Sequence, residues 1–219
     1  MKKRHDLPNF HKIDMKVDTG KLLEVYEKNI QKLVDEDQII NYSGEGNEHS
    51  STEMRACLKP FIAENGYVQI PVTKIKDEDR TTFANLRTGR ETQGDERNYS
   101  VIEDWAKDTY LEEVINSFSE PTRVRFCVVS PGGYITPHID YNTNYSVRYQ
   151  IPITTNEWSY VGVQRKNESP EIRHLEADGS VWFMNTGYNH SAWNMGKTDR
   201  IHLLVCVNSQ KELKSLLNK

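Results

Sequence analysis

A histidine and a carboxylate stand two residues apart at His138 and Asp140. In an extended strand, alternate side chains point to the same face, so these two would project together while Ile139 points away. His190, fifty residues after Asp140, offers a third ligand. Two histidines and one carboxylate occupy one face of an octahedral Fe(II) and leave three positions open. The three residues therefore predict a single metal site with room for chemistry.

An arginine follows His190 by ten residues. Arg200 opens the apolar run at residues 201–207, and a buried arginine can hold a carboxylate through a forked pair of hydrogen bonds. A hydrolytic zinc site could also use two histidines and one aspartate. Such a site does not require Arg200, so the arginine argues against the hydrolytic alternative.

Taken together, these residues resemble the Fe(II)- and 2-oxoglutarate-dependent oxygenases. Residues 146–153, of sequence SVRYQIPI, are similar to the aspartyl/asparaginyl β-hydroxylase branch, which also contains free-proline hydroxylases. The same branch is indicated by a spaced set at the end of the chain: Gly187, His190, Trp193, Asn194, Gly196 and Arg200. The resemblance covers roughly residues 123–207.

The resemblance implies roles for individual residues. The histidine–aspartate–histidine set would be the catalytic iron site, and Arg200 would bind the distal carboxylate of 2-oxoglutarate. Arg148 and Gln150 would also contact the cosubstrate, near its metal-bound end. The animal members have histidine at the position of Gln150, so this chain departs from them there. Members that act on aspartyl residues often have glycine in place of Asp140, which favours the smaller bacterial-type members.

The implied activity is the hydroxylation of an unactivated C–H bond of a small molecule, with a free amino acid or a derivative as the favoured class. Fe(II), 2-oxoglutarate and dioxygen would be required, with ascorbate as a reductant. One alternative is an aspartyl or asparaginyl residue in a peptide, and another is a lipid acyl chain. A non-catalytic, metal-binding cupin-like module is a third, but the paired Arg148 and Arg200 argue against it.

The second half of the chain is predicted to be almost wholly β. Short apolar or alternating runs separated by turn residues predict eight strands, at residues 124–130, 134–140, 146–153, 159–165, 171–175, 179–184, 191–194 and 200–207. Eight strands without intervening helices favour a double-stranded β-helix, which is the jelly roll of cupins. We further predict that the strands bearing His190 and Arg200 are antiparallel neighbours, joined by an odd-length loop or a bulge that lets both residues face one cavity.

The first half is predicted to be helical or mixed, with its helices packed outside the core. Residues 1–18 are expected to be extended or poorly ordered, helices are expected near residues 21–34, 51–58 and 102–118, and a strand near 67–72. Residues 87–98 are predicted to form a polar surface loop, or alternatively a lid whose Arg87, Arg90 or Arg97 contacts the substrate. One catalytic domain is predicted over 1–219, with a mixed part (1–120), a jelly-roll core (121–208) and a closing helix (209–219).

The bulk composition excludes several classes of partner. A formal net charge of −4 gives no general attraction to nucleic acid or to an anionic membrane. No apolar run approaches the length of a membrane span, and the basic residues 2–4 are not followed by the apolar core of a signal peptide. Three widely spaced cysteines form no disulfide framework. We therefore expect a soluble, cytoplasmic protein, and the sequence does not indicate its oligomeric state.

Overall fold

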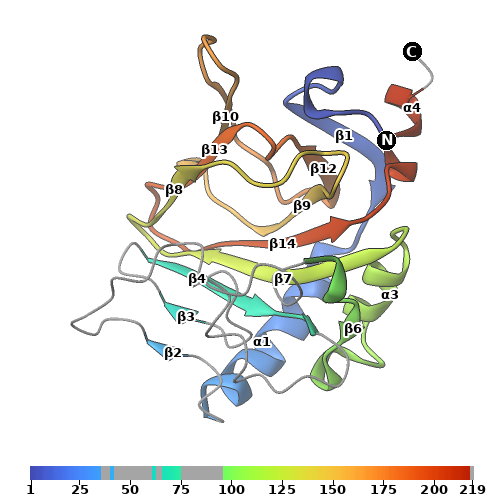
Figure 1. The fold of residues 1–219 in the computed structure, drawn as a ribbon. Coiled ribbons are helices and arrows are strands. Elements are labelled where there is room, and N and C mark those ends of the chain that lie inside the picture. Colours follow the sequence, from blue (N-terminus) through green and yellow to red (C-terminus); the bar gives the residue numbers. More distant parts are fainter. Residues whose placement is uncertain (36–39, 42–60, 63–65, 75–95, 218–219) are drawn as a thin grey trace, which may run out of the picture.

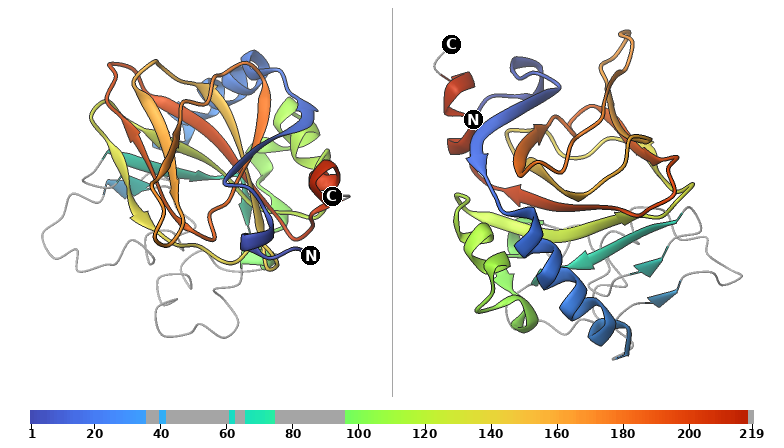
Figure 2. Two further views of the ribbon diagram at one scale, coloured as in Figure 1. Left: turned by 90° about the horizontal axis from the view of Figure 1, so that it is seen from above. Right: turned by 180° about the vertical axis from the view of Figure 1, so that it is seen from behind.

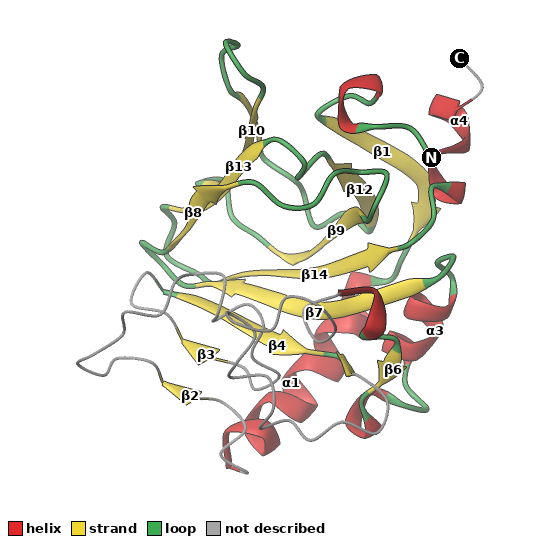
Figure 3. Ribbon diagram, viewed as in Figure 1, coloured by secondary structure: helices red, strands yellow, loops and turns green. Residues whose placement is uncertain are grey.

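The computed structural model describes residues 1–35, 40–41, 61–62, 66–74 and 96–217. Within these ranges the chain is mainly antiparallel β-structure, and two longer helices lie to one side of it (Figure 3). The predicted short helix near residues 51–58 falls outside the described residues.

Two sheets form the body of the molecule. The larger has eight strands, in the order β1 (Phe10–Lys16), β12 (Ser180–Met184), β9 (Val147–Thr154), β14 (Arg200–Val207), β7 (Pro121–Val129), β4 (Tyr67–Pro71), β3 (Phe61–Ile62) and β2 (Ile40–Asn41). The smaller has four, in the order β11 (Glu171–Arg173), β10 (Ser159–Gln164), β13 (Asn189–Asn194) and β8 (Tyr134–His138). A separate short pair joins β5 (Thr73–Lys74) to β6 (Val101–Ile102).

The smaller sheet lies over one face of the larger, which gives the jelly-roll core predicted from the sequence (Figure 1). Each of the eight predicted strands is present, with ends that differ from the prediction by a few residues. The chain passes repeatedly from one sheet to the other, as the strand orders show.

The outer face of the larger sheet is covered by helices α1 (Thr19–Asp35) and α3 (Tyr110–Asn116), which lie on the side away from β10 and β13 (Figure 2). Alternate residues of β7, β9 and β14 form this face and are almost fully buried with Leu22 of α1 and Leu111 of α3: Val124, Phe126, Val128, Val147, Tyr149, Ile151, Leu203, Val205 and Val207. Burial of this much apolar surface is the main source of stability for such a layer.

The inner face of the same strands is different in chemistry. Because side chains alternate along a strand, the residues between the apolar ones point toward the smaller sheet, and many are polar: Arg123, Arg125, Cys127, Arg148, Gln150, Arg200 and His202. The register keeps them on one face, since Arg200 pairs with Val129 and His202 pairs with Cys127. The sequence alternation thus separates a stabilising core outside from a polar cavity inside.

Two predictions for the first half are wrong. Residues 10–16 form β1 along the edge of the larger sheet, paired with β12, where we expected an extended or poorly ordered start. The predicted continuous helix over 102–118 is broken into a 3-10 turn at Asp104–Ala106 and the helix α3. Asp108 lies between them with a φ of 57°. This left-handed conformation cannot continue a right-handed helix.

The closing segment is helical, as predicted, with a 3-10 turn at Lys211–Leu213 followed by α4 (Lys214–Leu217). Two further 3-10 turns lie at Arg4–Asp6 and Glu96–Asn98. None of the helices in the described part of the chain is long and apolar enough to cross a membrane.

Candidate active site

The three predicted metal ligands come together at one edge of the smaller sheet. His138 is the last residue of β8, and His190 on β13 is its direct cross-strand partner, so the two imidazoles share a face. Their ring centroids are 4.0 Å apart. Asp140 lies just beyond the end of β8, where its backbone N–H donates to the carbonyl of Thr186 (2.9 Å).

The donor atoms of these residues converge on one point. Nε2 of His138 lies 3.7 Å from Asp140 Oδ1, and Nε2 of His190 lies 3.2 Å from Asp140 Oδ2. One potential ligand atom from each residue lies within 4.8 Å of the others. This is the spacing expected of atoms that surround a single small cation.

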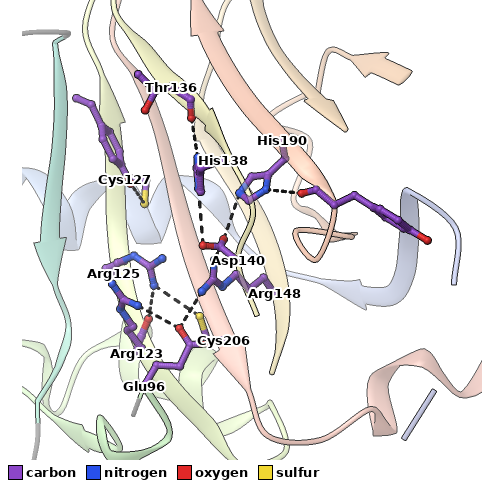
Figure 4. A network of polar contacts seen from close by, with 12 residues as sticks. Glu96, Arg123, Arg125, Cys127, Thr136, His138, Asp140, Arg148, His190 and Cys206 are labelled. Atoms are coloured by element: carbon purple, nitrogen blue, oxygen red, sulfur yellow. Dashed lines mark hydrogen bonds and ion pairs between the residues drawn. The ribbon is translucent and has the colours of Figure 1, made fainter. Parts of the chain in front are cut away.

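A backbone carbonyl close to Nδ1 of each imidazole determines which ring nitrogen carries the proton. Nδ1 of His138 lies 2.6 Å from the carbonyl of Thr136, and Nδ1 of His190 lies 3.0 Å from the carbonyl of Tyr188 (Figure 4). A carbonyl only accepts, so each Nδ1 carries the proton and donates it, which leaves each Nε2 lone pair directed at Asp140. Histidines that bind metals commonly have their other nitrogen held in this way. The residues present therefore fit a divalent metal ion.

A pocket lined by both sheets opens from the metal set. Its apolar lining includes Ile135, Val161, Met184 and Ala192, while four arginines line its other parts: Arg123, Arg125, Arg148 and Arg200. Asp140 and both histidines also line it. Ligand sites of this type, apolar with a few convergent polar groups, are the usual place for a small substrate.

Arg200 lines this pocket without a carboxylate partner among the described residues. It is 2% exposed, and its Nη2 donates a hydrogen bond to Nδ1 of His202 (2.9 Å). Burial lowers the pKa of Arg200 to about 10. A buried guanidinium without a counterion is costly unless a ligand supplies the negative charge. The position thus suits an anionic ligand.

His202 supports Arg200 from the same strand. Arginine has only donors, so Nδ1 of His202 accepts and the imidazole is neutral. Burial, followed by the charge of Arg200, lowers the pKa of His202 well below its usual range. The amide end of Gln150 lies 3.2 Å from the same ring nitrogen. Gln150 lines the pocket, and this contact joins it to the His202–Arg200 pair.

The predicted pairing of the two site strands is wrong. β13 belongs to the smaller sheet, between β10 and β8, whereas β14 lies in the larger sheet between β9 and β7. The chain crosses between the sheets after Asn194, a fully buried residue whose amide donates to the carbonyls of Val129 (2.7 Å) and Thr198 (2.8 Å). His190 and Arg200 nevertheless line one pocket, because the inner faces of the two sheets face each other.

Arg148 binds two carboxylates at once. One of its terminal nitrogens contacts Asp140, and the other lies 2.8 Å from a carboxylate oxygen of Glu96 (Figure 4). The same Glu96 oxygen lies 3.1 Å from Nη1 of Arg123. Burial alone would raise the pKa of Glu96, but Arg148, Arg123 and Arg125 lower it to about 2. Glu96 is therefore a buried anion that ties the Glu96–Asn98 turn to Arg148 and Arg123 of the larger sheet, and the sequence prediction missed it.

The loop predicted as a possible lid is only partly described. Arg87 and Arg90 lie outside the described residues, while Glu96–Asn98 forms the 3-10 turn noted above. The guanidinium carbon of Arg97 lies 4.4 Å from the centre of the Tyr145 ring, which is the distance of a cation–π contact. The lid itself stays a prediction.

A model of the family described as "Aspartyl/Asparaginyl beta-hydroxylase" matches residues 103–209, which contain the metal set, Arg148, Gln150 and Arg200. Residues 103–209 are thus similar to the aspartyl/asparaginyl β-hydroxylase family. This is the branch that the sequence motifs indicated, and similarity to a hydroxylase family supports an oxidoreductase. No curated protein matches the chain significantly.

Several solved structures are distantly similar to this chain. AviO1 from Streptomyces viridochromogenes Tue57 has a TM-score of 0.49 at 12% identity, over 93% of this chain and 90% of that one. A Pseudomonas putida prolyl-4-hydroxylase has a TM-score of 0.47 at 9% identity, over 90% and 91%. A 2OG-Fe(II) oxygenase family protein from Burkholderia pseudomallei has a TM-score of 0.42 at 11% identity, over 71% and 75%.

Proposed function

We propose that the chain is an Fe(II)- and 2-oxoglutarate-dependent dioxygenase that hydroxylates an unactivated C–H bond of a small molecule, with free amino acids and their derivatives as the substrate class. The observation that carries the proposal is the sharing of one pocket by the metal set and Arg200. A hydrolytic metal site has no use for a buried guanidinium without a counterion, whereas a dicarboxylate cosubstrate needs one.

The roles of the residues follow from their contacts. His138, Asp140 and His190 would hold Fe(II), and the bound iron would couple oxidative decarboxylation of 2-oxoglutarate to hydroxylation of the substrate. The backbone carbonyls behind both imidazoles keep each Nε2 available to the metal. Arg200 would orient the distal carboxylate of 2-oxoglutarate, and His202 would keep the guanidinium in place. The apolar side chains of the smaller sheet would exclude water from the reacting C–H bond.

The activity is tested by substrate-dependent succinate release. The purified protein is supplied with Fe(II), 2-oxoglutarate, ascorbate and oxygen, and a panel of free amino acids, aspartyl peptides and acyl lipids is added singly. We expect at least one free amino acid or derivative to raise succinate release, and omission of Fe(II) or 2-oxoglutarate to abolish it. If only the peptides or only the lipids raise succinate release, that class replaces free amino acids as the proposed substrate. If no compound of the panel raises succinate release, the proposal is refuted.

Arg200→Lys is expected to weaken 2-oxoglutarate binding even though it keeps the positive charge. The planar fork that pairs with a carboxylate is lost, at a cost of about 1–3 kcal/mol, or roughly 5- to 150-fold in Kd. Calorimetry of the Mn(II)-loaded protein without oxygen measures the Kd. Arg173→Lys, at an exposed position of β11, is the matched control. A wild-type Kd for Arg200→Lys would leave Arg200 with a structural role only.

A further inference from the structure

Two buried hydrogen-bond donors on the pocket wall have no partner among the described residues. They are Nε of Arg125 on β7 and the side-chain amide nitrogen of Gln69 on the neighbouring strand β4. Arg125 is 6% exposed, Gln69 is 4% exposed, and both line the pocket. A buried donor without an acceptor costs about 1–3 kcal/mol, so two on one wall call for an explanation.

The two donors are neighbours on one face of the larger sheet. Gln69 pairs with Cys127, and Arg125 lies two residues from Cys127 along the same strand. Such diagonal neighbours are about 7–8 Å apart at Cα, within reach of long side chains. Nη1 of Arg125 is already bound, to the carbonyl of Arg123 (2.9 Å) and near Cys206 Sγ (3.6 Å), which fixes the guanidinium. Nε of the same group is the buried donor left without a partner among the described residues.

This pair is separate from Arg200. In the β7–β14 register, Arg200 pairs with Val129, whereas Arg125 pairs with Leu204, four residues further along the strand. At about 3.3 Å per residue, the two arginines leave the backbone roughly 13 Å apart. Arg125 instead lies toward Arg148, because Cys206 contacts Arg125 and pairs with Arg148 on β9. Two anionic groups could therefore be held at the same time.

The charge of the site requires a second anion. Four arginines line the pocket, and the carboxylates of Asp140 and Glu96 offset two of them. Among the described residues, two positive charges remain. Fe(II) would add two and 2-oxoglutarate would remove two, so two positive charges are still without a counterion. Buried charge of this kind is stabilised by an opposite charge on a ligand.

We propose that Arg125 and Gln69 form the binding subsite for a carboxylate of the substrate. The inference rests on the proposed dioxygenase function and specifies its substrate class, an acid whose carboxylate enters the pocket in its ionised form. The guanidinium edge and the amide N–H would together donate to the two carboxylate oxygens, which is the geometry that arginine favours. Specificity would follow, because an analogue without the carboxylate leaves both donors unpaired.

The test compares acids with their amides. Each of the twenty L-amino acids, and the carboxamide of each one that binds, is titrated by calorimetry into the Mn(II)- and 2-oxoglutarate-loaded full chain without oxygen. We expect at least one amino acid to bind, and we expect its carboxamide to bind at least about 10-fold more weakly because a charge-assisted hydrogen-bonded pair is lost. Equal affinity for acid and amide, or binding of no amino acid, would overturn the subsite.

Two variants locate the effect. Arg125→Gln removes the charge, and Gln69→Glu places an internal carboxylate beside Arg125, at nearly unchanged size. Both are expected to abolish the preference for acid over amide and to leave the Kd of 2-oxoglutarate within about two-fold of wild type, since Arg200 is intact. Gln164→Glu, at an exposed position of β10, is the matched control for the second variant.

The outcomes separate this proposal from the proposed function. If Arg125→Gln or Gln69→Glu weakens 2-oxoglutarate as Arg200→Lys does, Arg125 belongs to the cosubstrate site and the subsite is refuted. If 2-oxoglutarate does not bind wild-type protein, the dioxygenase function fails. The acid–amide comparison is then made on the Mn(II)-loaded protein alone, where it still decides whether Arg125 and Gln69 bind a carboxylate.

Discussion

Fe(II) binding is expected to be lost in His138→Ala and in His190→Ala. Each variant removes one of three donor atoms that converge within 4.8 Å, so the metal would keep two protein ligands. Loss of a residue that merely supports a ligand typically costs 10- to 100-fold in metal affinity. Loss of a ligand itself should therefore weaken Fe(II) by more than about 100-fold, and turnover should fall with it. Anaerobic equilibrium dialysis followed by elemental analysis measures the bound iron.

His174→Ala is the matched control for these variants. His174 lies outside the pocket, and its Nδ1 also lies close to a backbone carbonyl, that of Ser159 (2.8 Å). The control thus removes an imidazole with the same type of backbone contact but no role at the site. It should keep wild-type iron content, and the near-UV circular dichroism of all three variants should confirm that they fold. Wild-type iron binding in both His138→Ala and His190→Ala would exclude this set as the metal site.

Strand positions and their faces could be predicted from the sequence, because alternation is a local property. Residues 147–151 alternate apolar and polar residues, and in the structure their apolar set packs against the helices while Arg148 and Gln150 face the pocket. The neighbours of β13 and β14 could not be predicted in this way. A short connection suggests a hairpin, but which sheet a strand joins depends on contacts distant in sequence, such as that of Asn194 with Val129.

The residues that the sequence prediction missed fall into two kinds. Arg125 and Gln69 carried a usable signal, since each interrupts an apolar strand with a polar side chain on the inner face. Glu96 carried none. It stands in a polar segment where every neighbour predicts solvent exposure, and only the approach of Arg148 and Arg123 from other strands makes it a buried anion. Strand β1 was missed because its pattern has just two buried apolar residues, Phe10 and Ile13.

Glu96→Gln is expected to destabilise the fold by about 3 kcal/mol at pH 7. The substitution keeps the size of the side chain but removes the charge that offsets Arg148 and Arg123, and breaking a buried ion pair in this way typically costs 3–5 kcal/mol. The pKa of Glu96 agrees with that magnitude. It falls from 4.5 to about 2 on folding, and each unit corresponds to about 1.4 kcal/mol. Urea denaturation measures the free energy of unfolding.

The pH dependence distinguishes this ion pair from a packing effect. Because folding lowers the pKa of Glu96, its contribution is fully present above the unfolded value of 4.5 and is lost as the pH falls toward 2. The difference in unfolding free energy between wild type and Glu96→Gln should therefore be constant from pH 7 to about 5.5, and less than about half should remain near pH 3. Glu168→Gln, at an exposed position, should change stability by less than about 0.5 kcal/mol at every pH. A difference for Glu96→Gln that does not change with pH would mean that its carboxylate is not held as an anion by the arginines, and the charge count of the pocket would have to be revised.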